Sequence, residues 1–530
     1  MLINKIKCKF KKGPVVLVSK EIAFTFPLSY AYLAGYLKMQ GEVVHVLFRP
    51  TNPSYFDLLV KQIMELKPVL VGFGSLYPEL NDIAKIIKML NDAGREFPVV
   101  IGGQMVSPIP EFAVKVTGAD FGVIGEGEIV LHQLVTTLRE DKDSSNVKGL
   151  AIRQDNEIIL TGAGEIIKDL TLLPPIPYEF FPKEKWLSIG RWYTANHPQP
   201  HWRFKDRVIN VHGGRGCPFS CNFCYHHSKP RYRPVYQMIA EAAEALDRFD
   251  GNMLYFSDET ALPSTVRVRQ VINEIRTLKR RIEYSVSSRF DILDKIDDNL
   301  LCEMKQTGCR IMGLGIESGS DRILKVIGKN FTAEVIRRGL ERLRKAGILP
   351  TVSIMVGQYT ETIEDVEISI ELMRESIRRN PNIQYAFTIT TPFPGSQLYN
   401  FIFEKDYLKD HKEFYDKYFH SIPRGSTDWN FVVNLSRMTN EELLLMYNKI
   451  KQVYMKEKIR YLNPIVAAVD FSRFFLGKVN QKLICKIIDR IPSNKALKFL
   501  LKIYNSIYDY IQIKLEDFCL RLRRLRQFKN

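Results

Sequence analysis

Three cysteines on one short run, Cys217, Cys221 and Cys224, constrain this 530-residue chain more than any other feature. Their Cys-x3-Cys-x2-Cys spacing offers three thiolates and no fourth. A closed structural zinc site wants four ligands, and the neighbouring His226 and His227 follow the third cysteine too directly for the usual zinc pairs. The odd number and the spacing argue against a disulfide framework. An iron–sulfur cluster on three cysteines keeps one iron open for a ligand, and the run predicts such a metal site.

The residues around the cysteines carry a resemblance to a known family. Gly216 and Pro218 bracket the first cysteine, and Phe223 precedes the third. The run resembles the signature of the radical S-adenosylmethionine (SAM) superfamily, in which three cysteines hold a [4Fe-4S] cluster and the open iron chelates SAM. The resemblance implies that Phe223 lies beside the adenine, although a core aromatic supporting the loop is the alternative. It also implies an electron donor such as flavodoxin or ferredoxin.

Length and charge bound the organisation of the chain. At 530 residues it is too long for one ordinary core, so we expect two to four domains. The N-terminus carries no apolar signal region, and no stretch approaches the roughly 20 apolar residues of a spanning helix. These features predict a cytoplasmic protein. The net charge of +17 is uneven, because residues 431–530 hold 20 Lys and Arg against 8 Asp and Glu. Uneven basicity argues against a general nucleic-acid binder.

The first part of the chain alternates short apolar strands with helices, which predicts an α/β fold with a Rossmann-like, doubly wound parallel sheet. Strand patterns cover 15–18, 43–48, 69–74, 99–103 and 121–124, and helical patterns cover 28–39, 56–66 and 80–91. Ligands in such sheets bind beyond the carboxyl ends of the strands. The residues expected there are Gly74, Ser75, Gly102, Gly103, Gly125 and Glu126.

Residues 12–140 are similar to the cobalamin-binding Rossmann domain that precedes many radical SAM cores. The resemblance implies that these strand-end residues bind cobalamin. One departure is clear, because the family motif Asp-x-His-x-x-Gly, whose histidine ligates cobalt, is missing. The two histidines of this region, His45 and His132, lie in a strand and a helix pattern. We therefore expect cobalamin to bind without a histidine lower ligand.

The second half predicts a partial (β/α)6 barrel of the radical SAM type. Residues 141–205 are expected to form a connector with a hairpin, followed by the barrel over 206–430. Six strand patterns separated by helices cover 208–211, 252–256, 284–287, 310–316, 351–356 and 385–390. The cysteine run follows the first of them, and functional residues of βα barrels cluster at the carboxyl ends of strands.

Acidic residues follow two of these strands. Asp258 and Glu259 occupy the position where the family contacts the SAM amino group, by charge-assisted hydrogen bonding. A solvated turn with Asp258 as a helix cap is the alternative. Glu317 comes directly after a buried apolar strand, where an acid is costly unless it is paired. The family's matching segment lies along SAM, so Glu317 is the predicted catalytic and cofactor-binding acid.

Three further strand ends carry candidate SAM contacts. Ser287 and Arg289 end the third strand and are expected to face the sugar or carboxylate of SAM, with a surface cation as the alternative for Arg289. Gly357 and Glu361 match the end of the fifth-strand motif of the family, where the backbone passes the adenine. These assignments follow from the resemblance.

The C-terminal region, 431–530, is predicted to be α-helical and basic, and it ends in a cluster of arginines. Three roles remain open. The helices would cap the barrel, lie on the inner face of a membrane near a lipid substrate, or bind RNA. No RNA-binding module is evident, which makes nucleic acid the weakest of the three.

The combined resemblance predicts a cobalamin-dependent methyl transfer to an unactivated carbon of a hydrophobic or secondary-metabolite substrate. Anaerobic radical cyclisation or another C–C bond-forming reaction on a lipid or tetrapyrrole is the alternative. A tRNA methylthiotransferase would carry a second cysteine triad, but Cys8 is the only cysteine before Cys217. A non-catalytic scaffold is disfavoured by the intact triad. Fold alone does not separate these functions.

Overall fold

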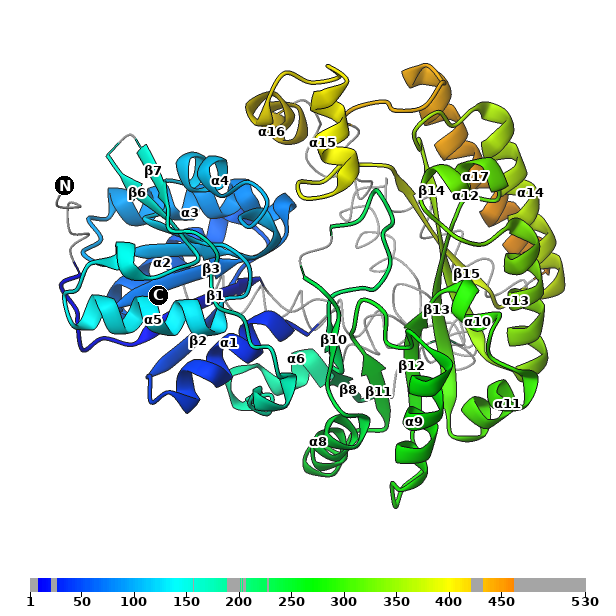
Figure 1. Cartoon of the computed structure of the whole chain (residues 1–530), viewed down its shortest axis with the longest axis horizontal. Helices are drawn as coiled ribbons and strands as arrows, with labels where there is room; N and C mark the ends of the chain where they lie inside the picture. Colours follow the sequence, from blue (N-terminus) through cyan, green and yellow to red (C-terminus); the bar gives the residue numbers. More distant parts are fainter. Residues whose placement is uncertain are drawn as a thin grey trace, which may run out of the picture.

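The computed structural model describes residues 8–20, 26–155, 157–187, 201, 203, 206–225, 228–420 and 432–461. His226, His227 and the basic segment 462–530 lie outside the described residues. The described chain forms two α/β units side by side, each built on its own sheet (Figure 1).

The first unit is a seven-stranded sheet in the order β2-β1-β3-β4-β5-β6-β7, with five parallel strands and an antiparallel edge. The strands are β1 Val15–Lys20, β2 Val44–Arg49, β3 Leu70–Gly74, β4 Val99–Gly102, β5 Phe121–Val123, β6 Leu150–Gln154 and β7 Glu157–Leu160. The hairpin expected in the connector therefore extends this sheet beyond residue 140.

Helices cover both faces of the first sheet. They are α1 Leu28–Met39, α2 Phe56–Leu66, α3 Leu80–Asp92, α4 Pro110–Thr117 and α5 Glu128–Arg139. Val15 and Leu17 of β1 belong to the core that includes residues of α1 and α5, whereas Val16 and Val18 belong to the core of α2, α3 and α4. Because both faces are buried, the parallel strands are continuous apolar runs.

The second unit is an open six-stranded parallel sheet in the order β15-β14-β13-β12-β11-β8. Its strands are β8 Val208–Val211, β11 Met253–Phe256, β12 Glu283–Ser288, β13 Cys309–Glu317, β14 Leu349–Val356 and β15 Gln384–Ile389. The edge strands β8 and β15 do not pair with each other, so the described residues form no closed barrel. The structure confirms the predicted α/β class and the open barrel.

Helices cover the outer face of this second sheet. They are α8 Val235–Arg248, α9 Thr265–Arg276, α10 Phe290–Leu293, α11 Asp298–Gln306, α12 Asp321–Val326, α13 Ala333–Ala346, α14 Ile363–Arg379 and α17 Asn440–Tyr461. The strand β14 alternates buried and partly exposed residues along its whole length. Its partly exposed positions include Thr351 and Ser353, next to Gly313 and Gly315 of β13. Gly313 leaves room on the inner face of the barrel, whereas the side chains of Glu317 and Lys329 cover Gly315.

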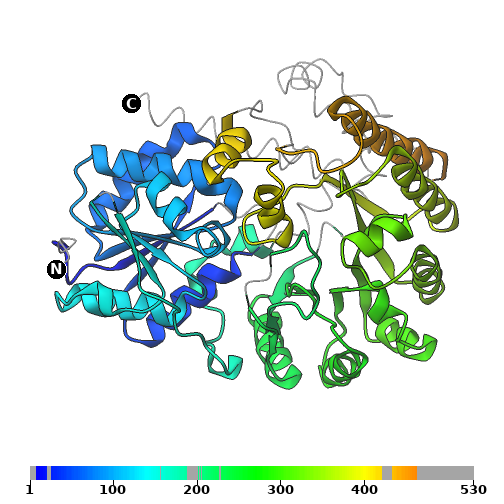
Figure 2. The same cartoon turned by 45° about the horizontal axis from the view of Figure 1, so that its top comes forward.

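Two helices after β15 reach back to the first unit. In Figure 2, α15 Gln397–Glu404 and α16 His411–His420, coloured yellow, lie between the barrel and the first sheet. The ring of Tyr77, in the short turn that follows β3, lies 5.5 Å from Phe414 and 5.4 Å from Tyr418 of α16. A short helix, α6 Lys183–Leu187, lies in the segment between the two units. Among the described helices, none is long and apolar enough to cross a membrane.

Candidate active site

The cysteine loop begins at the carboxyl end of β8 and is closed at its base by a two-stranded ribbon. The ribbon pairs β9 Gly214–Arg215 with β10 Arg231–Tyr232 in antiparallel fashion. Gly216 turns the chain into the loop with φ of +78°, and a Cβ there would lie 2.6 Å from the carbonyl oxygen of Ser228. The two arms of the loop thus approach closely where only glycine fits.

The three thiols have different surroundings. Cys217 Sγ lies 3.4 Å from Thr260 Oγ1, and the buried Cys221 Sγ accepts a hydrogen bond of 3.2 Å from Arg289 Nη1. The side chain of Cys224 reaches solvent, yet the protein around it desolvates the thiol. This desolvation raises the pKa of Cys224 to about 11, together with the Glu259 carboxylate and the other two thiols. The three thiols therefore lie close enough to interact.

The donor set fits an iron–sulfur cluster. Among the described residues, no three Cys, His, Asp or Glu side chains form a site for a single metal ion. A four-iron cluster does not require that arrangement, because each thiolate binds a different iron. Iron would also hold the sulfurs as thiolates despite the high pKa of Cys224.

Arg289 is buried rather than at the surface, which removes the surface-cation alternative. Its guanidinium donates to Asp291 at 3.0 and 3.2 Å and to Cys221, and its central carbon lies 3.8 Å from the centroid of the Phe219 ring. The side chain thus supports two residues of the cysteine loop. We infer that the third strand positions this loop through Arg289.

Asp258 and Ser287 brace the turns beside the loop. Asp258 Oδ1 accepts the backbone N–H groups of Gly213 and Gly214, at 2.8 and 2.6 Å. Burial raises the pKa of Asp258 to about 6, although these two donors lower it. Ser287 Oγ donates to the carbonyl of Asp258 and accepts from the N–H of Ala261. Neither side chain is a simple helix cap, and both fix the backbone around the end of β11.

Glu317 forms a buried ion pair that no spacing in the sequence marks. Its Oε1 lies 3.3 Å from Lys329 Nζ, and its Oε2 accepts from Ser353 Oγ at 2.9 Å. Glu317 has φ of +64°, at a bulge where β13 shifts register against β14. Lys329 also lies 5.9 Å from the centroid of the Phe223 ring. The expected partner of Glu317 is therefore Lys329, which links the acid to the cysteine loop.

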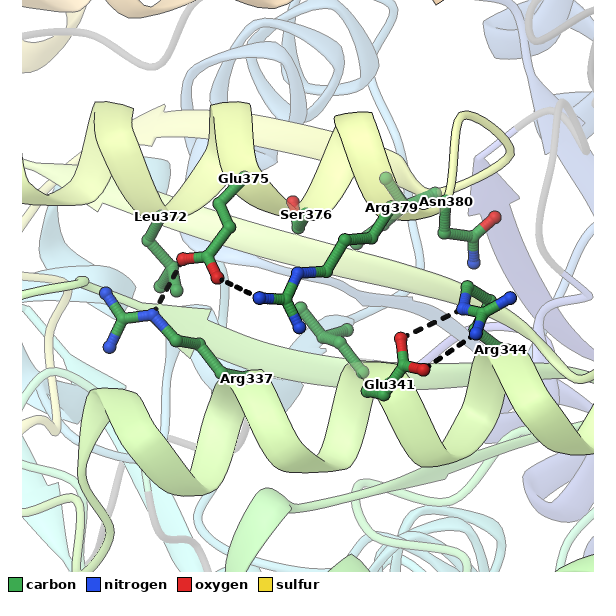
Figure 3. A pocket seen from close by; sticks show the side chains of 10 residues that line it. Arg337, Glu341, Arg344, Leu372, Glu375, Ser376, Arg379 and Asn380 are labelled. Carbon is green, nitrogen blue, oxygen red and sulfur yellow. Dashed lines mark hydrogen bonds and ion pairs between the residues drawn. The ribbon is translucent and has the colours of Figure 1, made fainter.

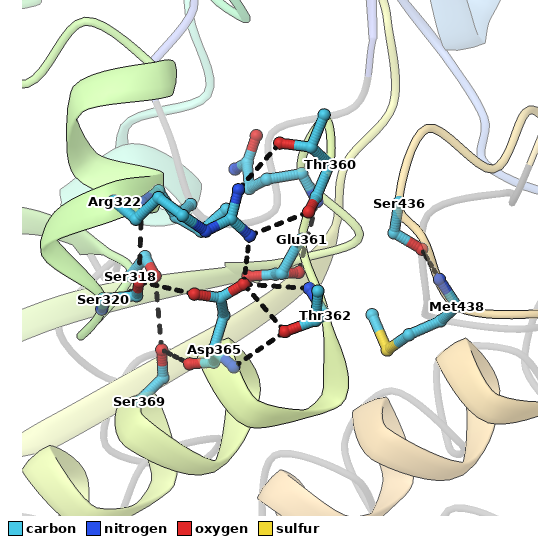
Figure 4. A network of polar contacts seen from close by, with 12 residues as sticks. Ser318, Ser320, Arg322, Thr360, Glu361, Thr362, Asp365, Ser369, Ser436 and Met438 are labelled. Atoms are coloured by element: carbon cyan, nitrogen blue, oxygen red, sulfur yellow. Dashed lines mark hydrogen bonds and ion pairs between the residues drawn. The ribbon is translucent and has the colours of Figure 1, made fainter.

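The end of β14 holds a buried polar network (Figure 4). Gly357 has φ of +89°, and its N–H donates to Glu361 Oε2 at 2.6 Å. Burial raises the pKa of Glu361 to about 8, with Asp365 raising it further and Arg322 lowering it. Between them, Gln358 is 1% exposed, and neither amide atom of its side chain has a hydrogen-bond partner. An unpaired buried amide is costly, so Gln358 is a candidate ligand contact that the sequence did not reveal.

The carboxyl edge of the first sheet exposes backbone without side chains. Gly103 and Gly125, with φ of +81° and +86°, are exposed, and Gly74, Ser75 and Gly102 lie partly exposed beside them. A Cβ on Gly125 would meet nothing within 4 Å. Such a bare edge fits a large flat ligand such as cobalamin.

A tyrosine and the histidines define this edge further. The hydroxyl of Tyr30 in α1 accepts the N–H of Gly74 at 2.7 Å and lies 2.6 Å from the carbonyl oxygen of Val18, so it ties the ends of β1 and β3 together. His45 lies within β2 and His132 within α5. Neither histidine of this unit is at the carboxyl edge.

Glu126, also expected at this edge, has a different surrounding. Its carboxylate pairs with Arg215 at 3.0 Å and with Arg231, both from the ribbon under the cysteine loop. Burial alone would raise the pKa of Glu126, but these two cations lower it below its usual value.

A separate groove lies away from these residues, between α13 and α14 (Figure 3). It is shallow, and its charged side chains pair with one another. Arg379 and Asn380 are among its lining residues, so the groove lies at the C-terminal end of α14, away from Gly357. The groove is a seam between two helices, and the strand-end residues lie elsewhere.

Comparison with known proteins agrees with this arrangement. Residues 15–135 match the B12 binding domain, and residues 211–373 match the radical SAM superfamily. The chain is 26% identical to an uncharacterised methyltransferase of Pyrococcus horikoshii, over 72% of this chain and 79% of the relative. It is also 26% identical to the anaerobic magnesium-protoporphyrin IX monomethyl ester cyclase of Rubrivivax gelatinosus, over 87% and 82%. The solved structure of OxsB, a cobalamin-dependent SAM radical enzyme, shares the fold with a TM-score of 0.63 at 14% identity, over 94% and 76%.

Two α/β units of these kinds, in this order, define a class of enzyme. The chain is a radical SAM enzyme with an N-terminal B12 binding domain. This confirms the family predicted from the cysteine loop and from the glycines of the first sheet, and with it the cofactor classes of the two domains. The roles of the individual site residues stay predictions.

Proposed function

We propose that this enzyme transfers a methyl group from SAM, by way of cobalamin, to an unactivated carbon of a hydrophobic or secondary-metabolite substrate. One observation supports it above the others. The side chain of Tyr225, next to Cys224, is hydrogen-bonded to Ser107 of the first unit, and Ser107 Oγ accepts the N–H of Gly125. The side chain of Ser107 thus links Tyr225, at the end of the cysteine loop, to Gly125 at the bare edge of the first sheet.

The residues divide between three tasks in this proposal. Cys217, Cys221 and Cys224 would hold the cluster, and Gly74, Ser75, Gly102, Gly103 and Gly125 would support cobalamin without a histidine lower ligand. The SAM contacts would be Phe223, Asp258, Glu259, Ser287, Arg289, Glu317 and Gly357. When bound, the cluster would supply the electron that splits SAM, and cobalamin would carry the methyl group.

The protein's own part is to hold SAM in one orientation and to keep water away. The side chains of Lys329 and Ser353 hold the two carboxylate oxygens of Glu317 in place beside the cysteine loop. The buried amide of Gln358 would find its missing partners on a ligand. Gly313 would leave space for that ligand along β13, because a Cβ there would meet nothing closer than 3.6 Å, whereas Glu317 and Lys329 cover Gly315. A dry site limits quenching of a radical.

Radical cyclisation is the second candidate, because the cyclase relative covers more of this chain than the methyltransferase relative does. Both relatives are equally identical to this chain, so identity does not separate the two reactions. A methylthiotransferase is less well supported, since Cys8 stands alone and its Sγ contacts the carbonyl of Val69 at 3.3 Å.

Two partners belong to this proposal. A small redox protein such as flavodoxin or ferredoxin would supply the electron. The excess positive charge of 462–530 would attract an anionic membrane surface and bring the enzyme to a lipid or other hydrophobic substrate.

Anaerobic reconstitution with iron, sulfide, SAM and cobalamin tests the proposal. We expect the protein to retain the visible absorption of both cofactors and, with a substrate from a hydrophobic panel, to form S-adenosylhomocysteine and 5′-deoxyadenosine. Methyl-labelled SAM should label the product. Deoxyadenosine without labelled product would favour cyclisation, and loss of cobalamin on gel filtration would overturn the methyl-transfer proposal.

The cysteine assignment has a matched pair of variants. Cys221→Ala should lower the iron content to background, because one of three ligands is lost. Cys302→Ala, at an exposed position on α11, should leave it unchanged. Full iron content in Cys221→Ala would remove the basis of the assignment.

A further inference from the structure

A buried ion-pair network joins the two units at the base of the cysteine loop. Arg215 Nη1 lies 3.0 Å from Glu126 Oε2, and Arg215 Nη2 lies 2.5 Å from Glu128 Oε1. Arg231, directly across the ribbon from Arg215, pairs with the other oxygen of Glu126. Two cations of the barrel thus face two carboxylates of the B12 binding domain.

The network is unusually well shielded from water. The exposed fractions of the side chains are 11% for Arg215, 15% for Arg231, 9% for Glu126 and 5% for Glu128. Exposed ion pairs contribute little to the stability of a folded protein. Removing one partner of a buried pair, in contrast, strongly destabilises the protein, because it leaves a buried charge uncompensated. Equal numbers of opposite charges also leave no net charge buried at the junction.

The ribbon needs such support. Each of its strands has two residues, and an isolated two-stranded ribbon is marginally stable in water. Arg215 is separated from Cys217 only by Gly216, so any displacement of the ribbon moves the first cysteine. The guanidinium of Arg231 also donates to the carbonyl of Ile167, which follows the first sheet in the chain.

The carboxylates are fixed on their own side as well. Glu128 is the first residue of α5, and Glu126 follows Gly125 at the end of β5. Both are thereby attached to the edge that carries the glycines of the first sheet. The carboxylate of Glu126 is already engaged by two guanidinium groups, which leaves it a poor contact for a neutral ligand.

We propose that Glu126 and Glu128 are positioning residues for the cysteine loop, acting through Arg215 and Arg231, and that Glu126 is not a cobalamin contact. This assignment rests on the proposed function, because it presumes that the loop holds a cluster. In this assignment, the ion-pair network fixes the distance between the cysteine loop and the carboxyl edge of the first sheet.

The variants Glu126→Gln and Glu128→Gln test the assignment in the reconstituted full-length chain. We expect each to lose iron to a chelator roughly tenfold faster than the wild type, because two buried guanidinium groups are left with one carboxylate between them. The electron paramagnetic resonance spectrum of the reduced cluster with SAM should broaden, and the cobalamin retained on gel filtration should equal that of the wild type.

Glu42→Gln is the matched control. Glu42 forms a largely buried ion pair with Arg139 at 2.5 Å, entirely within the first unit. Glu42→Gln should lower the melting temperature about as much as Glu126→Gln does. It should leave unchanged the rate of iron loss to the chelator and the electron paramagnetic resonance spectrum of the cluster. Glu126→Asp keeps the charge on a shorter side chain, so its rate of iron loss should lie between those of the wild type and Glu126→Gln. If Glu126→Gln does not fold, Glu126→Asp takes its place in the test.

Two results would overturn the assignment. Loss of cobalamin from Glu126→Gln with normal iron retention would make Glu126 a cobalamin contact, and wild-type behaviour of all variants would make the network irrelevant to the loop. A wild-type protein that takes up neither cofactor would instead count against the proposed function itself.

Discussion

Among single residues, Glu361 carries the clearest electrostatic signature. It is buried, and burial raises its pKa to about 8, well above that of a free glutamate. The N–H groups of Gly357 and Gln358 both donate to its Oε2, which would favour the ionised form, but they do not outweigh desolvation. The folded protein therefore holds a proton on Glu361 at pH values where the unfolded chain has released it.

This predicts a pH-dependent difference between the wild type and Glu361→Gln. Between about pH 4.5 and 8 the unfolding free energy of the wild type should fall relative to the variant, by about 1.4 kcal/mol per pH unit. Below this window Glu361 is protonated in both states, and above it the carboxyl is ionised in both. Denaturant titrations at several pH values measure the difference. Glu364→Gln, at an exposed position of the following helix α14, is the control, and parallel profiles for wild type and Glu361→Gln would contradict the prediction.

Among the elements, the loop after β15 sets the position of the cysteine loop from the opposite edge of the barrel. Gly395 has φ of +90°, and a Cβ there would lie 2.2 Å from the ring of Tyr225 and 3.0 Å from Pro108 of the first unit. Three segments that are far apart in the sequence thus meet where only a glycine fits. The ring of Tyr225 cannot yield easily, because its hydroxyl is bound to Ser107.

Gly395→Ala should therefore displace Tyr225 and weaken retention of the cluster beside it. Gly94→Ala is a control that separates backbone strain from steric contact. Gly94 also has a positive φ, but a Cβ there would meet nothing within 4 Å. We expect Gly94→Ala to lower the unfolding free energy by about 1 kcal/mol, and Gly395→Ala by a further 1–3 kcal/mol, about the usual cost of overpacking. Only Gly395→Ala should lose iron faster to a chelator. Partial recovery in Gly395→Ala with Tyr225→Ala would show that the ring is the obstacle, and equal iron loss in both glycine variants would refute the idea.

For the whole molecule, the distribution of charge predicts how the enzyme meets a surface. Residues 462–530 hold 14 Lys and Arg against 5 Asp and Glu, about half of the net charge of the chain. Lys and Arg near an anionic bilayer each contribute about 1 kcal/mol. We expect the full chain to sediment with vesicles containing phosphatidylserine, but not with pure phosphatidylcholine vesicles.

The same chain shortened after residue 461 should stay in solution with both kinds of vesicle, while its iron content stays that of the full chain. Raising the salt concentration should release the full chain, because screening weakens surface attraction. Equal sedimentation of the full and shortened chains would place the contact elsewhere or exclude it.

The elements that the sequence predicted well are those whose signal is local. The six barrel strands and the five parallel strands of the first sheet are short and mostly apolar, and each appears within a few residues of its expected position. The strands β6 and β7 were expected as a hairpin, but nothing local indicates that β6 pairs with β5. The cysteine loop was predictable because its spacing is the signal.

The contacts around the site were less predictable because they join distant residues. Lys329 meets Glu317 across the helix α12, 12 positions away, and Arg215 meets Glu128 across 87 positions of the chain. Neither pair has a characteristic spacing. Gln358 was overlooked because a glutamine after a strand is ordinary, and only its unpaired buried amide distinguishes it.

The ion-pair network and the Tyr77 contact together define how the two units can separate. The network lies beside β8, at one edge of the open sheet, whereas Tyr77 packs on α16, which follows β15 at the other edge. A rigid-body opening that turns about one of these attachments as a hinge would break the other, together with the contact between Tyr225 and Ser107. The attachment with the lower strength decides on which side the interior becomes accessible, and with it the direction from which a large cofactor is exchanged.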